Sequence, residues 1–246
     1  MGAQRLVDVR IVITGTSRGL GRALALAAGA EGARLVVHAR DAAAADGLAE
    51  ELRARGADAV AVAGDLRDPT LGPRVAAAAA AAFGGLDVMV LNAGALGPMA
   101  PLVDTDLEAF AEVMDVNVDA QVRLLVASLP MLVSARGMVV WMSTGLGRFG
   151  LPRYGSYAAS KHAVEGLMKV LAAEHGDDGL VSVAVAPGMV ETDMLQRAIG
   201  PHDPAAFKTP AQYAEQMVRL IAGRGPALNG LSLELDMAVG TVPANG

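Results

Sequence analysis

The pair of side chains with the clearest chemical potential is a tyrosine and a lysine four residues apart. In the run Tyr157-Ala158-Ala159-Ser160-Lys161, this spacing puts Tyr157 and Lys161 on one face of a helix. A free phenol titrates near pH 10, and lowering its pKa by about 3 units corresponds to roughly 4 kcal/mol of preferential phenolate stabilisation. A neighbouring ammonium favours the phenolate, so Tyr157 could exchange a proton with a carbonyl or an alcohol. Taken alone, the pair is equally consistent with a packed tyrosine and a solvated lysine.

A glycine-rich turn near the start of the chain is suited to binding a phosphate. The run Thr14-Gly15-Thr16-Ser17-Arg18-Gly19-Leu20-Gly21 follows a short apolar stretch and precedes an alanine- and leucine-rich one. Where a strand turns into a helix in this way, glycines let the backbone approach a pyrophosphate, and unpaired N–H groups at the helix start meet its charge. Three glycines can also simply make a tight turn, so the cluster by itself is weak evidence.

The same turn matches the nucleophile elbow of α/β-hydrolases. Gly15-Thr16-Ser17-Arg18-Gly19 fits the pattern G-x-S-x-G, including its place between a strand and a helix. A hydrolase elbow is preceded by earlier strands and by an oxyanion loop, whereas only about a dozen residues precede this turn. We therefore favour the phosphate-binding interpretation.

Seven short apolar runs alternate with helical stretches along the chain. Runs that are apolar throughout, rather than alternating, are typical of parallel strands covered on both faces, and the intervening helices would provide the covers. The sequence predicts a three-layer α/β/α fold with a Rossmann-type, doubly wound parallel sheet of about seven strands. The predicted strands are 10–14, 34–38, 59–63, 88–91, 138–142, 181–186 and 231–235, and the predicted helices lie near 19–30, 41–55, 72–83, 106–135, 157–175 and 210–223.

Composition narrows the class of protein. The 246 residues are 53% hydrophobic and 19% charged, with a net charge of -6 and no cysteine. This length suits a single α/β domain, so residues 1–246 are expected to form one dinucleotide-binding and catalytic domain. Without cysteine there is no disulfide or thiolate chemistry, the four histidines lack metal-ligand spacing, and we predict no metal. The sequence lacks the basic face that nucleic-acid binding requires, and nucleic acid is therefore not an expected partner. It also lacks a signal segment and an apolar run of 18 residues, which favours a cytoplasmic protein without membrane partners.

Taken together and in order, the motifs resemble those of the classical short-chain dehydrogenase/reductase family, over essentially the whole chain. The matching pieces are Thr14 to Gly21, Asp65-Leu66, Asn92-Ala93-Gly94, Asn117, Tyr157 to Lys161, and Pro187-Gly188 with Thr192. The resemblance implies an oxidoreductase that binds a nicotinamide dinucleotide. It implies that Asn117, Thr144, Tyr157 and Lys161 are the catalytic residues, with Asn117 holding a helix kink and a water of the proton relay.

The resemblance also implies a set of residues that bind the cofactor. Asp65 would bind the adenine amine, the Asn92 stretch would pass under the adenine ribose, and Lys161 would bind the nicotinamide ribose. The full expected set is Gly15, Ser17, Arg18, Gly19, Leu20, Gly21, Arg40, Asp65, Leu66, Asn92, Ala93, Gly94, Tyr157, Lys161, Pro187, Gly188, Val190 and Thr192.

Two positions depart from the family pattern. The catalytic serine of the family lies thirteen positions before the tyrosine, where this chain has Thr144, preceded by Ser143. Threonine keeps the hydroxyl donor, although its methyl group restricts χ1, and we expect Thr144 rather than Ser143 to contact the substrate. Near the end of the chain, Asp236-Met237-Ala238 replaces the Asp-Gly-Gly of many relatives.

The residues after the second predicted strand bear on the cofactor. Ala39 stands where NAD-preferring relatives have an acid that binds the ribose hydroxyls. A carboxylate there would repel a 2'-phosphate, whereas Arg40 and Arg18 would place it between two guanidinium groups. We therefore predict a preference for NADP(H) over NAD(H).

The predicted activity is hydride transfer to or from a small apolar ketone, aldehyde or secondary alcohol. The expected apolar pocket consists of Leu96, Phe149, Leu151, Tyr154, Met194 and Leu195. Arg148 and Arg153 could meet an anionic group or face water, and we favour water. The alternative is a non-catalytic dinucleotide sensor on the same fold. A homo-oligomer is expected, with a tetramer favoured through the helices at 106–135 and 157–175.

Overall fold

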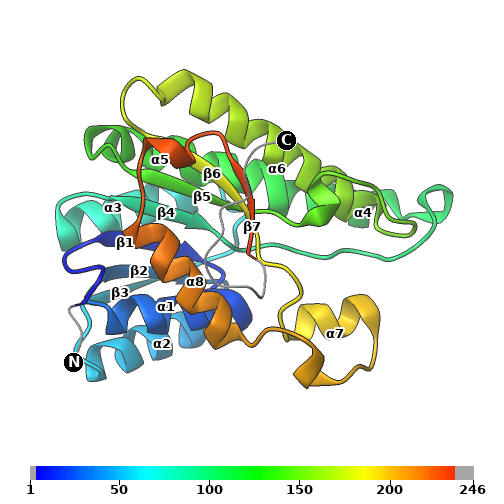
Figure 1. The fold of residues 1–246 in the computed structure, drawn as a ribbon, viewed down its shortest axis with the longest axis horizontal. Helices are drawn as coiled ribbons and strands as arrows, with labels where there is room; N and C mark the ends of the chain where they lie inside the picture. The colour runs from blue at the N-terminus through cyan, green and yellow to red at the C-terminus, as the bar shows by residue number, and fades with distance from the viewer. Residues whose placement is uncertain (1–3, 236–246) are drawn as a thin grey trace.

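The fold is a parallel sheet covered by helices on both faces, as the apolar runs predicted. In the computed structural model, which describes residues 4–235, seven parallel strands pair in the order β3-β2-β1-β4-β5-β6-β7 (Figure 1). The strands are β1 (Arg10–Thr14), β2 (Arg34–Ala39), β3 (Ala59–Ala63), β4 (Val88–Leu91), β5 (Met138–Met142), β6 (Val181–Ala186) and β7 (Ser232–Glu234). The order reverses between β1 and β4, and in open α/β sheets ligands bind at this switch point, outside the carboxyl ends of the strands.

The helices agree with the predicted ones except at three places. They are α1 (Gly19–Ala30), α2 (Ala42–Ala54), α3 (Leu71–Phe83), α4 (Leu107–Met114), α5 (Ala120–Ser134), α6 (Gly155–His175), α7 (Asp193–Ile199) and α8 (Pro210–Ala222). The stretch expected as one helix at 106–135 is divided by a π-helix at Asp115–Asp119. The helix predicted from 157 begins two residues earlier, and α7 lies in a stretch expected to be a loop.

The core is divided by the sheet into two layers, because successive side chains of a strand point to opposite faces. Ile11 and Ile13 pack with α1, α2 and α8 on one face, whereas Val12 between them packs with α3, α5 and α6 on the other. Every residue of β5 and β6 is buried. This two-sided burial is why those strands are apolar throughout.

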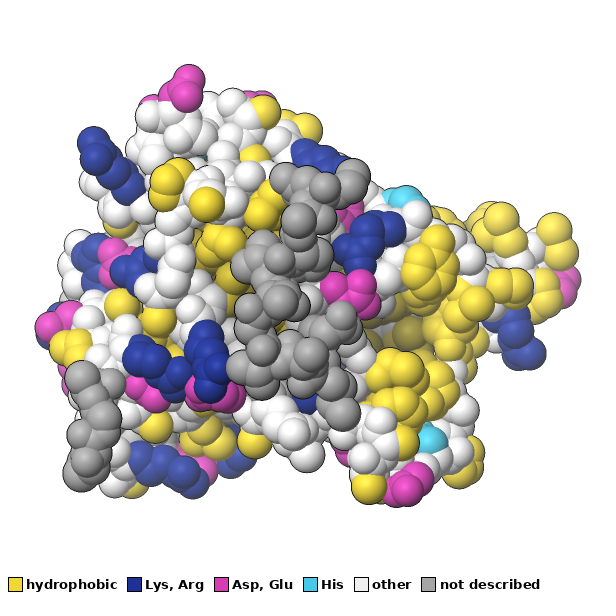
Figure 2. Space-filling view, viewed as in Figure 1, with side chains coloured by type: hydrophobic (Ala, Val, Ile, Leu, Met, Phe, Trp, Pro, Cys, Tyr) yellow, Lys and Arg dark blue, Asp and Glu magenta, His cyan; other side chains and the backbone are white. Residues whose placement is uncertain are grey.

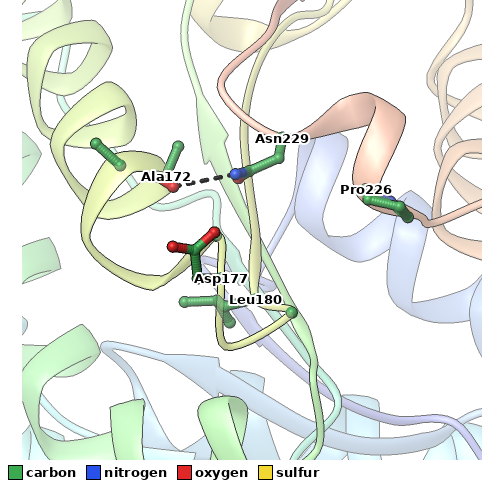
Figure 3. A pocket seen from close by; sticks show the side chains of 8 residues that line it. Ala172, Asp177, Leu180, Pro226 and Asn229 are labelled. Atoms are coloured by element: carbon green, nitrogen blue, oxygen red, sulfur yellow. Dashed lines mark hydrogen bonds between the residues drawn. The ribbon is translucent and has the colours of Figure 1, made fainter.

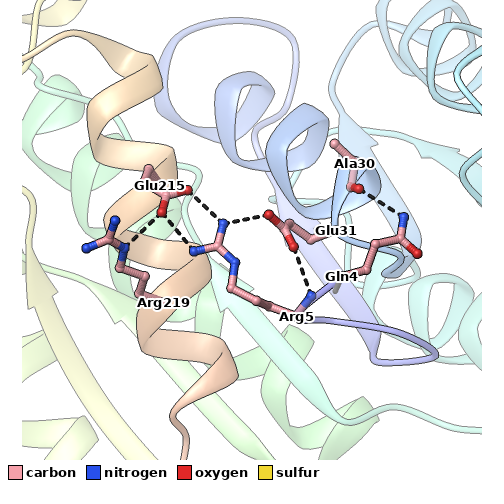
Figure 4. Close-up of polar contacts among 6 residues, drawn as sticks. All are labelled: Gln4, Arg5, Ala30, Glu31, Glu215 and Arg219. Atoms are coloured by element: carbon pink, nitrogen blue, oxygen red, sulfur yellow. Dashed lines mark hydrogen bonds and ion pairs between the residues drawn. The ribbon is translucent and has the colours of Figure 1, made fainter. Parts of the chain in front are cut away.

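The segment before β1 is tied to the helices of one face by an ion-pair cluster. Arg5 donates to Glu31 just after α1, at 2.6 Å, and to both carboxylate oxygens of Glu215 on α8, at 2.7 and 2.8 Å (Figure 4). Arg219 donates to the same Glu215 carboxylate at 2.8 Å. The cluster links α1 and α8, which also share the apolar core on this face of the sheet.

The helical stretch Leu107–Ser134 is apolar and long enough, by length and composition, to cross a membrane. Of the most apolar 18-residue window in this stretch, 44% is buried inside the protein. A core helix passes the same test, so the finding carries no further argument. Asp236-Met237-Ala238, noted above as a departure from the family pattern, lies outside the described residues.

Candidate active site

The glycine turn between β1 and α1 is packed against the end of β4. A Cβ on Gly21 would lie 2.4 Å from the Gly15 carbonyl oxygen and 2.5 Å from Asn92 Nδ2, and one on Gly15 would lie 2.8 Å from Ala93 Cα. Gly15 also has a φ of 71°, in the region that favours glycine. The close approach of the protein's own atoms therefore requires glycine at both positions, whether or not a ligand is bound.

Thr14 organises this junction, a role that the sequence analysis missed. Its hydroxyl accepts hydrogen bonds from the backbone N–H groups of Asn92 and Ala93, each at 3.0 Å. Asn92 Nδ2 in turn donates to the Thr14 carbonyl at 2.8 Å. The predicted cofactor residues of the turn and of the β4 end are thus brought together by hydrogen bonds between side chains and backbone. A buried threonine at the end of a strand gives no sequence signal of such a role.

The first backbone N–H groups of α1 donate no hydrogen bond to the side chain at the cap position. The cap position is Arg18, whose side chain makes no capping hydrogen bond, so the first N–H groups of the helix lack that partner. Ser17 and Arg18 are exposed, while Gly19 and Leu20 are partly exposed. These groups can receive an anion at the positive end of the helix.

The tyrosine and lysine lie on one face of α6, as their spacing predicted. Lys161 Nζ is 5.6 Å from the centroid of the Tyr157 ring, and it donates to the Met142 carbonyl at the end of β5, at 2.7 Å. A Cβ on Gly94 would lie 3.8 Å from the same Nζ. Lys161 therefore joins α6 to the carboxyl ends of β4 and β5, at the edge where the glycine turn also lies.

Burial shifts the pKa of both groups. It raises the pKa of Tyr157 to about 12 and lowers the pKa of Lys161 to about 8, because it penalises the charged form of each. The direction for Tyr157 is opposite to the lowering that phenolate chemistry requires. In the protein alone, desolvation outweighs the nearby ammonium, and Tyr157 carries its proton at neutral pH.

Asn117 lies in the π-helix between α4 and α5, which agrees with the expected kink. Its Oδ1 accepts from Ala95 N at 2.7 Å, and its Nδ2 donates to Ala95 O at 2.9 Å and to Ser160 Oγ at 3.0 Å. Ser160 donates to the Tyr157 carbonyl at 2.8 Å. Single π-turns are frequent at functional sites, and this one connects the loop after β4 to the turn of α6 that carries Tyr157.

The structure separates the two candidate hydroxyls. Ser143 is buried, and its Oγ donates to Glu165 on α6 at 2.6 Å. Thr144 is partly exposed, and among the described residues no hydrogen bond ties its hydroxyl. The Ser143 hydroxyl is therefore occupied within the protein, whereas the hydroxyl of Thr144 is free to meet a ligand.

The loop after β6 lies against the glycine turn. A Cβ on Gly19 would lie 3.6 Å from Thr192 Cγ2, and Arg18 forms an exposed ion pair with Asp193 at 3.4 Å. Thr192 also caps α7, with its hydroxyl accepting from Leu195 N at 3.2 Å. Val190 is buried, and the Pro187 carbonyl accepts from Lys208 at 3.1 Å. Gly188, another residue of this loop that was expected to bind the cofactor, has a φ of 73°, in the region that favours glycine.

Asp65, Leu66 and Arg40 are less closely tied to the rest of the site. The Asp65 carboxylate accepts from the Arg67 backbone at 2.9 Å and from its guanidinium at 2.8 Å, and Arg67 holds the pKa of Asp65 down at about 2. Leu66 is partly exposed and Arg40 exposed. Thr16 in the glycine turn donates to the carbonyl of His38 at the end of β2, at 2.9 Å, which links the Arg18 turn to the strand that leads to Arg40.

The structure bears on three predictions about the pocket residues and corrects one of them. Arg148 and Arg153 are both exposed, as predicted, and Arg148 also donates to Ser232 Oγ at 2.6 Å and to Glu234 at 3.1 Å. Arg153 donates to the Met99 carbonyl at 3.1 Å. Tyr154 is not simply apolar lining, since its hydroxyl donates to the Ala198 carbonyl at 2.6 Å and joins α6 to α7.

A separate pocket lies near the amino ends of β6 and β7, at the opposite end of the strands from the candidate site. It has a volume of about 300 Å³ and lies between the end of α6 and the turn before β7, where Ala172, Asp177, Leu180, Pro226 and Asn229 line it (Figure 3). Asn229 already donates to Ala172 O and accepts from Ser182 N. The polar atoms of its side chain are thus occupied in supporting the fold, and none of the predicted site residues lies there.

Comparison with known proteins supplies the context for this geometry. Residues 10–201 match the model of the short chain dehydrogenase family. The chain is 32% identical to the short chain dehydrogenase mdpC of Emericella nidulans over 96% of this chain and 88% of that one, and 31% identical to the NADPH-dependent pterin aldehyde reductase of Arabidopsis thaliana over 94% and 95%. A short chain dehydrogenase from Escherichia coli CFT073, solved in complex with NADPH, superposes with a TM-score of 0.89 at 30% identity, covering 95% of this chain and 99% of that one.

Proposed function

The chain belongs to the short chain dehydrogenase family and is an oxidoreductase, and from that premise we propose that it uses NADP(H) to reduce a carbonyl group or to oxidise the corresponding alcohol, with Tyr157 as the acid/base. The observation that carries the proposal is the position of Lys161, between the Tyr157 ring and the carboxyl ends of β4 and β5. This is the edge of the sheet at which the glycine turn and its open helix start also lie.

The residues at the glycine turn fit a dinucleotide. Gly15 and Gly21 leave no room for a Cβ, and the α1 start presents uncapped N–H groups, which suit a pyrophosphate. When bound, NADP(H) supplies or accepts the hydride. Arg18 and Arg40 would hold the 2'-phosphate, and Lys161, the Asn92 stretch and the loop from Pro187 to Thr192 would hold the ribose and nicotinamide end.

In reduction, Tyr157 donates its phenolic proton to the carbonyl oxygen as the hydride reaches the carbon, so that one alcohol forms. Its raised pKa keeps this proton in place at neutral pH. Lys161 stabilises the phenolate that remains, because an ammonium close to the ring favours the charged form. The Thr144 hydroxyl would donate to the same carbonyl oxygen and polarise it. Asn117 fixes the α6 turn through Ser160.

The substrate proposed for this site is apolar. Exposed hydrophobic side chains gather between α4, the start of α6 and α7 (Figure 2), where Leu102, Phe149, Leu151, Met189 and Ile199 are each at least 45% exposed. Arg148 donates to Ser232 Oγ and Arg153 to the Met99 carbonyl, and we propose that both are directed at these protein groups rather than at the substrate. A small apolar ketone, aldehyde or secondary alcohol fits this surface better than a charged one.

The alternative is a relative that binds the dinucleotide without catalysis. A sensor needs the glycine turn but has no need of a proton donor. The contacts of Asn117, Ser160, Tyr157 and Lys161 with one another and with the strand ends favour catalysis, and turnover of NADPH with a carbonyl compound separates the two functions.

The two exposed arginines are expected to set the cofactor preference. The wild-type protein should bind NADPH more tightly than NADH in an equilibrium titration followed by nicotinamide fluorescence. Arg18→Ala and Arg40→Ala should each weaken NADPH binding about tenfold, since each removes a charge-assisted hydrogen bond of roughly 1.5–3 kcal/mol, and should leave NADH binding unchanged. The Arg18–Asp193 ion pair is no obstacle, because an exposed pair contributes little.

Arg55→Ala is the matched control, because Arg55 is an exposed arginine beyond the end of α2, paired with Glu51. It should change neither affinity. Wild-type binding of NADH as tight as that of NADPH would overturn the preference, and binding of neither would contradict the dinucleotide site.

We also propose a homotetramer assembled through α5 and α6. Val126 on α5 is 64% exposed and Val170 on α6 is 51% exposed. Both helices cover the same face of the sheet, and large exposed apolar side chains there suit close packing between subunits. Light scattering should give four times the mass of one chain, and Val170→Glu should lower that mass. Val7→Glu, at a 57% exposed valine of the N-terminal segment, should not. A monomeric wild-type protein would contradict the assembly.

A further inference from the structure

Glu165 is a buried carboxylate on the face of α6 that carries the proposed chemistry. It follows Lys161 by four residues and Tyr157 by eight, so all three lie along one side of the helix. Its side chain is not part of any ion pair within the described residues. Instead, Glu165 Oε1 accepts hydrogen bonds from two hydroxyl groups, that of Ser143 at 2.6 Å and that of Ser232 at 2.9 Å.

The first of these contacts fixes the residue directly before Thr144. Ser143 is anchored a second time by its backbone, whose N–H donates to Val185 O on β6 at 2.8 Å. The turn that follows has no slack, since a Cβ on Gly147 would lie 2.7 Å from Ser143 Oγ and 3.1 Å from Glu165 Cγ. Without the Ser143–Glu165 contact, the backbone from which the Thr144 hydroxyl projects would be held on this side by the Val185 hydrogen bond alone.

The second contact anchors the far end of the same turn. Arg148 donates to Ser232 Oγ at 2.6 Å, so the single proton of that hydroxyl is directed at Glu165. Arg148 also pairs with Glu234 on β7 at 3.1 Å. The turn from Ser143 to Arg148 is thus held at both ends through one carboxylate on α6.

We propose that Glu165 is a positioning residue, which orients the Thr144 hydroxyl toward the reacting carbonyl by holding Ser143 at one end of the turn and, through Ser232, Arg148 at the other. This inference rests on the proposed function, because it requires that Thr144 polarises the substrate. Glu165 itself contacts neither substrate nor cofactor. Its effect on the reaction passes entirely through the geometry of the turn.

The test is a double-mutant cycle in kcat. Glu165→Gln keeps the shape of the side chain and one acceptor oxygen but removes the carboxylate, and should lower kcat about fivefold, the difference between a hydrogen bond to a charged and to a neutral acceptor. In a Thr144→Ala background, the same substitution should change kcat less than about twofold, because no hydroxyl is left to orient. NADPH affinity should be unchanged in both backgrounds.

Two further variants make the outcome decisive. Ser143→Ala removes the contact from the other side, and should give the same pattern even if Glu165→Gln fails to fold. Glu174→Gln, at an exposed glutamate farther along α6, should have no effect. An equal loss of kcat with and without the Thr144 hydroxyl would reduce Glu165 to a structural role and overturn the inference. An active Tyr157→Phe would instead overturn the proposed function itself.

Discussion

Replacing Tyr157 with phenylalanine is expected to lower kcat for NADPH-dependent carbonyl reduction about 10³-fold, a loss within the range of general acid catalysis. The ring and its packing on α6 are retained, and only the proton donor is removed. NADPH affinity should change little, because the glycine turn and Lys161 are intact. Steady-state kinetics and a fluorescence titration on the same preparation measure the two quantities, and a Tyr157→Phe protein with wild-type turnover would contradict the mechanism.

The pH dependence of the wild-type enzyme provides an independent check of the same assignment. Burial lowers the pKa of Lys161 to about 8, so its ammonium is present below that pH and is lost above it. The phenol, with a pKa of about 12, stays protonated across the range. Reduction should therefore decline as pH rises through about 8. A rate that instead rises there would show that the lysine charge is not needed.

Thr144→Ala is expected to lower kcat about 10²-fold, as the loss of one donor to a developing oxyanion does in other enzymes. Ser143→Ala should cost no more than about tenfold, because the Ser143 hydroxyl is buried on Glu165 and acts only through the turn. Thr144→Ser should retain most of the activity, since the donor is kept. The reverse order, with Ser143→Ala inactive and Thr144→Ala active, would move the polarising hydroxyl to Ser143.

The sheet and the main site were predictable because each depends on local pattern. The strands are buried on both faces, so their sequences are apolar without interruption, and the spacing of Tyr157 and Lys161 fixes their common helix face whatever surrounds them. The kink at Asn117 was expected only from the family resemblance. No local pattern around that residue distinguishes a π-turn from a continuous α-helix.

Features that depend on tertiary packing were not predictable in the same way. The Glu165–Ser143 contact joins residues 22 positions apart, and its existence depends on how tightly one turn lies on α6. Arg148 is exposed, as predicted, but its contacts on and beside β7 join residues more than 80 positions apart and left no local signal. Helix α7 did leave a local signal, namely Thr192 before its first turn and Gly200 after its last, but its seven residues lay within a stretch expected to be irregular.

The cluster around Arg5 also has a consequence for the order of events during synthesis. Arg5 and Glu215 are separated by 210 positions, so at about 5–20 residues per second the arginine leaves the ribosome roughly 10–40 s before its partner. Until α8 has been translated, α1 lacks the helix that it packs against in the finished protein, and its apolar side is uncovered. Completion of this face is thus a late step, which follows the translation of α8.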